Sequence, residues 1–66
     1  MNMDVLKGNW KELSGKAKAE WGLLTGDEVM QAEGDREQLT GLIQEKYGLA
    51  KEEAQQQVDA FISKHS

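Results

Sequence analysis

Six of the seven glycines in this 66-residue chain form two triplets in which successive glycines lie seven positions apart. The triplets are Gly8, Gly15 and Gly22, then Gly34, Gly41 and Gly48. The second triplet follows the first at an offset of 26 residues, and the intervening sequence repeats as well. Residues 8–15 read GNWKELSG and residues 34–41 read GDREQLTG, while WGL at 21–23 recurs as YGL at 47–49. This duplication predicts two copies of one helical unit packed against each other.

Length and composition restrict the chain to one helical domain, residues 1–66. Proline is absent and β-branched residues are few, whereas Ala, Leu, Glu, Gln and Lys, which favour helices, dominate. No stretch alternates apolar and polar residues for long enough to indicate a strand. We therefore predict an all-α protein. A chain this short buries only about 60% of the surface that its unfolded form exposes, so we expect marginal stability.

We expect neither export nor membrane insertion for this chain. The absence of cysteine excludes disulfides and thiolate chemistry, and it fits a reducing compartment. No apolar run approaches the length of a membrane span, and the start, MNMDVLK, lacks a basic head followed by an apolar stretch. We expect a cytoplasmic protein without a membrane span.

The net charge of −4 disfavours general binding to nucleic acid, which needs surplus cations to displace counterions from phosphates. The charge is unevenly distributed. Residues 1–21 carry four lysines against three acidic residues, whereas residues 22–66 carry four cations against nine anions. The sequence thus predicts one mildly basic helix on an acidic body.

The first helix is expected over residues 4–21. Its apolar residues recur at steps of three or four and fall within roughly 80° of arc on a helical wheel. They are Leu6, Trp10, Leu13, Ala17, Trp21 and Leu24. Gly22 is placed to end the helix in the left-handed conformation, with Leu23 or Leu24 folding back onto the last turn.

A short second helix is expected over about 26–32, because Thr25 and Glu28 have the spacing of a capping box. The repeat favours a break at 32–35 and a third helix over about 35–47, ended by Gly48. The apolar face of the third helix comprises Leu39, Leu42, Ile43 and Tyr47.

A fourth helix is expected over about 50–64. Acidic residues in its first turn and Lys64 in its last match the helix dipole. Its buried stripe is expected to contain Ala50, Ala54, Val58, Phe61 and Ile62. Short connections fold successive helices back on each other as hairpins. We therefore predict a compact four-helix domain of two αα-hairpins packed at a steep angle, as in SAM domains. A looser three-helix arrangement with a disordered second segment is the alternative.

The two glycine triplets are expected to face solvent, because on a helical wheel each lies opposite the apolar stripe of its helix. Gly15 and Gly41 then lie in the middle of helices, where each costs about 1 kcal/mol relative to alanine. They are either tolerated on a solvated face, or they offer bare backbone to a partner or keep the helices weak. We expect Gly15→Ala and Gly41→Ala each to raise the thermal midpoint.

No catalytic, cofactor-binding or metal-binding residue can be assigned from the sequence. The single histidine, His65, is expected to be a solvated tail residue, since nothing near it could orient a general base. The serines and threonines lie in no nucleophile motif, the acidic residues do not match a calcium loop, and no phosphate-binding loop is present. Trp10, Trp21 and Tyr47 could stack on bases, but their helical positions favour core packing.

One weak binding surface is a candidate. Lys7, Lys11 and Lys18 lie within roughly 40° of one another on the wheel of a continuous first helix. They could contact phosphate or a lipid surface, although a solvated lysine face also accounts for them. We expect no small-molecule substrate and a monomer.

The repeat blocks themselves resemble a known family. GNWKELSGKAKAEWG at 8–22, Leu24 and Thr25 followed by an acidic pair, and EGDREQLTGLIQEKYG at 33–48 are similar to the CsbD-like family, particularly its YjbJ-type small bacterial proteins. The resemblance covers nearly the whole chain. It implies a cytoplasmic bacterial protein abundant under general stress, a SAM-like helical fold, and no established enzymatic activity, cofactor or site residue. Ala32 and Asp35 depart from the family's pattern, which predicts a less rigid second helix.

Two functions follow as hypotheses. The first is a non-enzymatic stress-response protein with a protective or accessory role. The second is a small binding or adaptor module whose lysine face, Lys7, Lys11 and Lys18, contacts an acidic partner, nucleic acid or a membrane surface. An enzyme would need a constellation of residues that the sequence does not contain.

Overall fold

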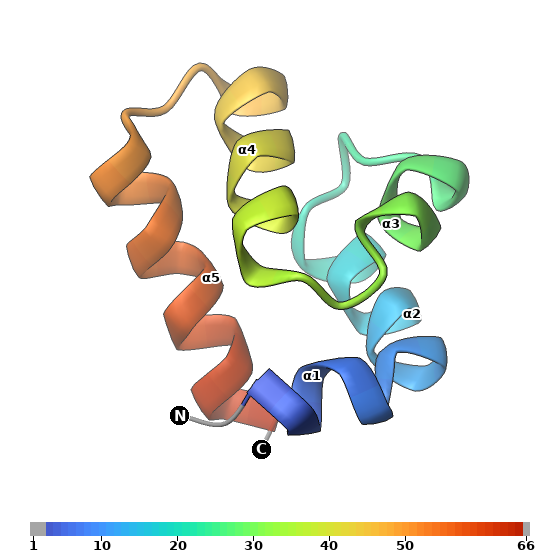
Figure 1. Cartoon of the computed structure of the whole chain (residues 1–66). Helices are drawn as coiled ribbons and strands as arrows, with labels where there is room; N and C mark the ends of the chain where they lie inside the picture. Colours follow the sequence, from blue (N-terminus) through green and yellow to red (C-terminus); the bar gives the residue numbers. More distant parts are fainter. Residues whose placement is uncertain (1–2, 66) are drawn as a thin grey trace.

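The computed structural model describes residues 3–65, and this part of the chain consists of five helices without a strand (Figure 1). The helices are α1 (Met3–Gly8), α2 (Trp10–Glu20), α3 (Gly26–Ala32), α4 (Arg36–Tyr47) and α5 (Lys51–His65). Helix α4 packs along α5 and α2 packs on α3, while α1 lies across the end of the molecule at which α5 finishes. The all-α prediction is confirmed.

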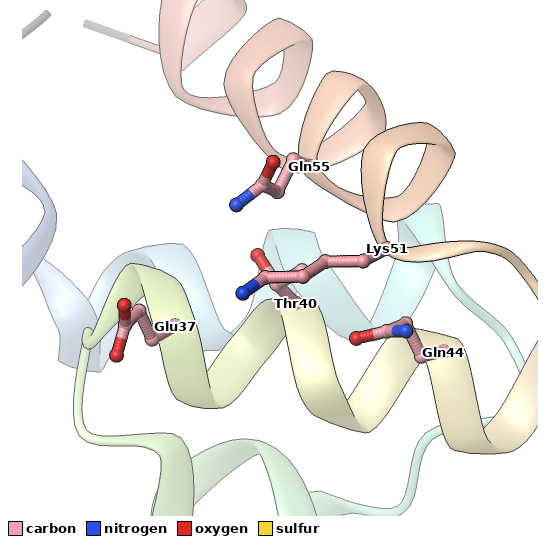
Figure 2. A pocket seen from close by; sticks show the side chains of 5 residues that line it. All are labelled: Glu37, Thr40, Gln44, Lys51 and Gln55. Atoms are coloured by element: carbon pink, nitrogen blue, oxygen red, sulfur yellow. The ribbon is translucent and has the colours of Figure 1, made fainter.

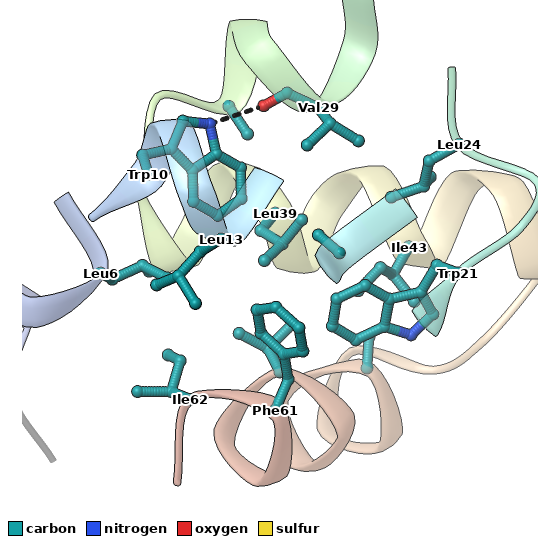
Figure 3. Close-up of a cluster of buried hydrophobic side chains, with 14 residues drawn as sticks. Leu6, Trp10, Leu13, Trp21, Leu24, Val29, Leu39, Ile43, Phe61 and Ile62 are labelled. Atoms are coloured by element: carbon teal, nitrogen blue, oxygen red, sulfur yellow. Dashed lines mark hydrogen bonds between the residues drawn. The ribbon is translucent and has the colours of Figure 1, made fainter. Parts of the chain in front are cut away.

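The core draws on every helix. Its residues come almost entirely from the apolar stripes that the sequence predicts, and Figure 3 shows the rings of Trp10, Trp21 and Phe61 among aliphatic side chains. Each core side chain is at most 6% exposed: Leu6, Trp10, Leu13, Ala17, Trp21, Leu24, Val29, Ala32, Leu39, Ile43, Ala54, Val58, Phe61 and Ile62. Burial of these stripes is the main stabilising contribution available to a chain without cysteine.

The prediction of one continuous first helix over 4–21 is wrong, and so is the count of four helices. The helix is divided at Asn9, whose φ of −114° and ψ of 18° are not helical. Gly8 and Asn9 are both poor helix formers, and the bend lets α1 bring Leu6 into the core beside α2. The repeat itself carried this signal: Asn9 corresponds to Asp35, which precedes α4 just as Asn9 precedes α2.

The two helix ends marked by glycine differ. Gly48 has a φ of 66° and its N–H donates to the Gln44 carbonyl at 2.9 Å, so its role as a left-handed cap is confirmed. For Gly22 the same prediction is wrong, because α2 ends at Glu20 and Trp21 leaves the helix at a φ of −120°. The Trp21 indole is held against α5, so the chain turns one residue early and needs no left-handed glycine.

The capping box before α3 is confirmed. The Thr25 hydroxyl accepts from the Glu28 N–H at 3.2 Å, and the Glu28 carboxylate accepts from the Thr25 N–H at 3.0 Å. At the next helix the Asp35 carboxylate accepts from the N–H groups of Glu37 and Gln38. The helix expected over about 26–32 is therefore formed, as α3, and the alternative of a three-helix arrangement with a disordered second segment is wrong.

Gly34 overturns the expectation that all six glycines face solvent. It is buried, its φ is 73°, and a Cβ built on it would lie 2.9 Å from the Lys7 Cα and 3.0 Å from the Leu6 carbonyl oxygen. Gly34 thus lets the backbone of α1 approach the α3–α4 corner. At each of the other five glycines of the triplets, an added Cβ would meet no atom within 4 Å, as expected for an outward face.

Three apolar residues are less buried than predicted. Tyr47 is 38% exposed, Ala50 lies outside α5 and is exposed, and Leu42 is only partly buried against the core. Between the two candidates after Trp21, Leu24 folds into the core whereas Leu23 stays 58% exposed.

Candidate functional site

The three lysines proposed from the sequence are exposed, but they do not lie on one helix. Lys11 and Lys18 belong to α2, whereas Lys7 belongs to α1. The helical wheel placed the three lysines together only for one continuous helix, so the break at Asn9 means that it no longer places Lys7 beside the other two. Among the described residues, the ion pairs engage Lys16, Arg36, Lys46 and Lys64. The three candidate lysines therefore have no carboxylate partner among residues 6–65, the part of the chain whose side chains are described.

A polar hollow of about 220 Å³ lies between α4 and α5 (Figure 2). It is lined by Glu37, Thr40, Gln44, Lys51 and Gln55. The Lys51 side chain extends over Thr40 toward Glu37, but the Thr40 hydroxyl already donates to the Arg36 carbonyl at 2.7 Å. The hollow can hold water or a small polar solute by its charged rim, and it contains no activated nucleophile. The sequence interpretation did not identify it.

Two further hollows, of about 320 and 270 Å³, lie between α2 and α5 and share Glu20 and Lys64, whose ion pair spans 3.6 Å. His65 lines the second of them and is not the solvated tail residue that the sequence predicts. Its ring meets the edge of Phe61 at a centroid distance of 4.7 Å, because α5 continues to His65 and places the two rings one helical turn apart.

The side chains of residues 6–65 contain no cluster that could ligate a metal ion. No group of three His, Cys, Asp or Glu side chains among them could hold such an ion, and each buried side-chain nitrogen or oxygen has a hydrogen-bond partner. The same residues contain no helix with the length and apolar content required to cross a bilayer.

The polar contacts with the best geometry join helices instead of forming a site. The Arg36 guanidinium donates two hydrogen bonds to Asp59, at 2.6 and 2.9 Å, and ties the start of α4 to α5. These bonds hold the pKa of Asp59 below its ordinary value and the pKa of Arg36 above its own.

The second such contact joins α4 to α3. The Lys46 ammonium lies 2.6 Å from the Glu28 carboxylate. This bond lowers the pKa of Glu28 and raises that of Lys46. Because Glu28 also closes the capping box, the ion pair fixes the start of α3 to the end of α4. Sequence reasoning missed both pairs, since partners on different helices leave no mark in spacing.

The tryptophans are structural. Trp10 and Trp21 are 6% and 4% exposed, which confirms core packing over base stacking. The Trp10 Nε1–H donates to the Val29 carbonyl at 2.9 Å (Figure 3), and the Trp21 Nε1–H donates to the Gln57 side chain at 3.0 Å. Tyr47 lies at the surface, and its hydroxyl accepts from the Leu23 N–H at 3.1 Å.

Comparison with known proteins finds one family. The CsbD-like family matches residues 4–56. A UPF0337 protein of Bordetella pertussis is 54% identical over 65 residues, covering 98% of both chains. The UPF0337 protein YjbJ of Escherichia coli is 48% identical and covers 98% of this chain and 94% of its own. A UPF0337 protein of Pseudomonas aeruginosa is 52% identical over 61 residues. No solved structure matches the chain.

Proposed function

Since the chain belongs to the CsbD-like family, we propose that it is a non-enzymatic, cytoplasmic stress-response protein. In this proposal its folded surface makes weak contacts with other macromolecules. The observation that carries the proposal is where the polar groups lie. The well-aligned ion pairs and the indole hydrogen bonds hold helices together, and the hollows are open and lined by surface side chains. This arrangement suits an accessory or protective role better than conversion of a substrate.

Composition supports the protective form of the proposal. The mean hydropathy is −0.72, and 30% of the residues are charged, which gives the protein a hydrophilic surface that favours solubility at high concentration. The likeness of the helix arrangement to SAM domains, and a monomeric state, remain predictions under this proposal.

A drying and heating assay tests this function. A heat-labile enzyme is dried or heated with the purified protein, with an equal mass of albumin, or with the Gly34→Ala variant, whose fold we expect to be weakened. We expect higher recovered activity with the intact protein than with either control. Recovery equal to that with albumin would refute protection, and recovery equal to that with the variant would show that composition suffices without the fold.

The adaptor function is the second candidate, and one observation favours it: Lys7, Lys11 and Lys18 are exposed and have no ion-pair partner among residues 6–65, whose side chains the structure describes. Neutralising all three with glutamine should abolish binding to an anionic vesicle or oligonucleotide, and binding by the unaltered protein should weaken steeply with salt. The matched control is Lys16→Gln, whose lysine is paired with Glu12 at 3.8 Å. Unchanged affinity in the triple variant would exclude this surface.

A further inference from the structure

The break between α1 and α2 is less firmly held than its counterpart between α3 and α4. Asn9 precedes α2 without a side-chain cap bond, whereas Asp35 caps α4 with two. The α3–α4 corner also contains two consecutive left-handed residues, Glu33 at a φ of 54° and Gly34 at 73°. Gly8 has no such conformation. Joining α1 to α2 therefore requires little more than a change of backbone angles at Asn9.

The apolar pattern runs through this break without a change of phase. Leu6, Trp10 and Leu13 follow at steps of four and three, which would place them on one face of a straight helix. In the bent form the same three residues are buried in one core. The sequence is thus compatible with a bent chain and with a continuous helix over residues 3–20.

Helix α1 depends on docking for its stability. A six-residue helix is not stable alone in water, because the cost of helix nucleation exceeds what so few hydrogen bonds return. Its anchors are Leu6, which is 0% exposed, and the backbone of residues 6 and 7, which lies against Gly34. If α1 swings outward, the place of Leu6 in the core becomes an apolar groove, and the segment that complements this groove is another copy of α1.

We propose that Gly8 and Asn9 form a hinge through which α1 is exchanged between two copies of this chain. In the exchanged dimer α1 and α2 form one helix in each copy, and Leu6 fills the core of the partner. The contacts of α1 with the core are retained, and the N–H groups of Trp10 and Lys11 at the start of α2 come within reach of carbonyl groups in α1. The entropy lost on association opposes the exchange, so the bent monomer prevails in dilute solution and the dimer forms at high concentration.

The hinge is tested by comparing two double variants that each carry two helix-favouring substitutions. Gly8→Ala with Asn9→Ala straightens the hinge, whereas Gly15→Ala with Gly41→Ala strengthens helices elsewhere. Molar mass is measured by light scattering after gel filtration from micromolar to millimolar concentration. We expect a dimer dissociation constant about tenfold lower for the hinge variant, because Asn9 is helical only in the exchanged form, so that Asn9→Ala favours this form in both chains. Equal constants for the two variants would overturn the proposal.

A second measurement distinguishes exchange from face-to-face association. In a dimer made of isotope-labelled and unlabelled chains, the contact between the α-protons of Gly34 and Lys7 must cross between chains if α1 is exchanged. A contact found only within each chain would refute exchange even if a dimer forms. If circular dichroism shows that the double hinge variant does not fold, Asn9→Ala alone undergoes the same two measurements.

Discussion

The two copies of the repeat agree in the middle of their long helices and differ at both ends. Leu13 and Leu39 are both core residues, and Ala17 and Ile43 are both completely buried. Their neighbours Ser14 and Thr40 agree as well, because each hydroxyl donates to a carbonyl of its own helix. The middle of each copy faces the shared core, so its residue roles are retained.

The ends differ because they meet different neighbours. Gly34 receives the backbone of α1, while Gly8 has no atom near the position of a Cβ. At the other end, Trp21 is buried beside Phe61 at a ring-centroid distance of 4.9 Å, whereas its counterpart Tyr47 stays at the surface. A duplicated segment therefore preserves what its own helix determines and changes where the rest of the chain contacts it.

The largest expected difference between the copies concerns their aromatic residues. Trp21→Ala removes a buried ring and the bond to Gln57, and we expect it to lower the free energy of unfolding by about 4 kcal/mol. Tyr47→Ala removes a half-exposed ring and one hydrogen bond, which should cost about 1 kcal/mol. Urea unfolding followed by circular dichroism measures both. Equal losses would contradict the conclusion that Trp21 is a core residue and Tyr47 a surface residue.

The next difference concerns the first glycine of each triplet. Gly34→Ala forces a methyl group into the backbone of α1 at a left-handed position, so we expect a loss of about 3 kcal/mol. Gly8→Ala at micromolar concentration should instead be neutral or stabilising, by at most about 1 kcal/mol. Urea unfolding of the two variants decides this, and a stabilising Gly34→Ala would mean that α1 does not pack there.

A smaller effect should be the same in both copies. Gly15→Ala and Gly41→Ala each place a methyl group in open space on a helix, and each should stabilise the protein by about 1 kcal/mol. The thermal midpoint should rise equally for the two, and the rises should add in the double variant. A midpoint lowered by either substitution would reveal packing or strain at that site.

The smallest effect is a dependence on pH at the ion pair that joins the second copy, through Arg36, to Asp59 of α5. The pKa of Asp59 is depressed by its bonds to Arg36, so the pair stabilises the fold above the ordinary carboxyl pKa, and the contribution is lost as pH falls through the depressed value. Asp59→Asn should therefore cost under about 1 kcal/mol at neutral pH, because the pair is partly exposed, and less in acid.

Unfolding by urea at neutral and acidic pH measures this dependence. Glu12→Gln in the first copy is the control, since the Glu12–Lys16 pair is longer, at 3.8 Å, and more exposed. A penalty for Asp59→Asn that does not shrink in acid would show that the ion pair is not its cause.

Sequence reasoning located the apolar stripes, the capping box at Thr25 and the left-handed cap at Gly48, because each depends on residues within one or two turns of the same segment. It failed at Asn9, Gly22 and Gly34. A continuous helix over 4–21 satisfied the local pattern, and only the position of Gly34 against α1 shows why the chain bends. The ion pairs of Asp59 and Glu28 likewise join residues distant in sequence.

The sequence by itself determined that the chain is helical, that it is duplicated, and which side chains leave water, since helix propensity and apolar periodicity are local properties. Tertiary structure alone decided where the first helix bends, which glycine the backbone of another helix approaches, and which aromatic residue is buried. Those outcomes depend on contacts between helices that are distant in the sequence. The two copies of the repeat have similar local patterns, but each copy packs against different helices.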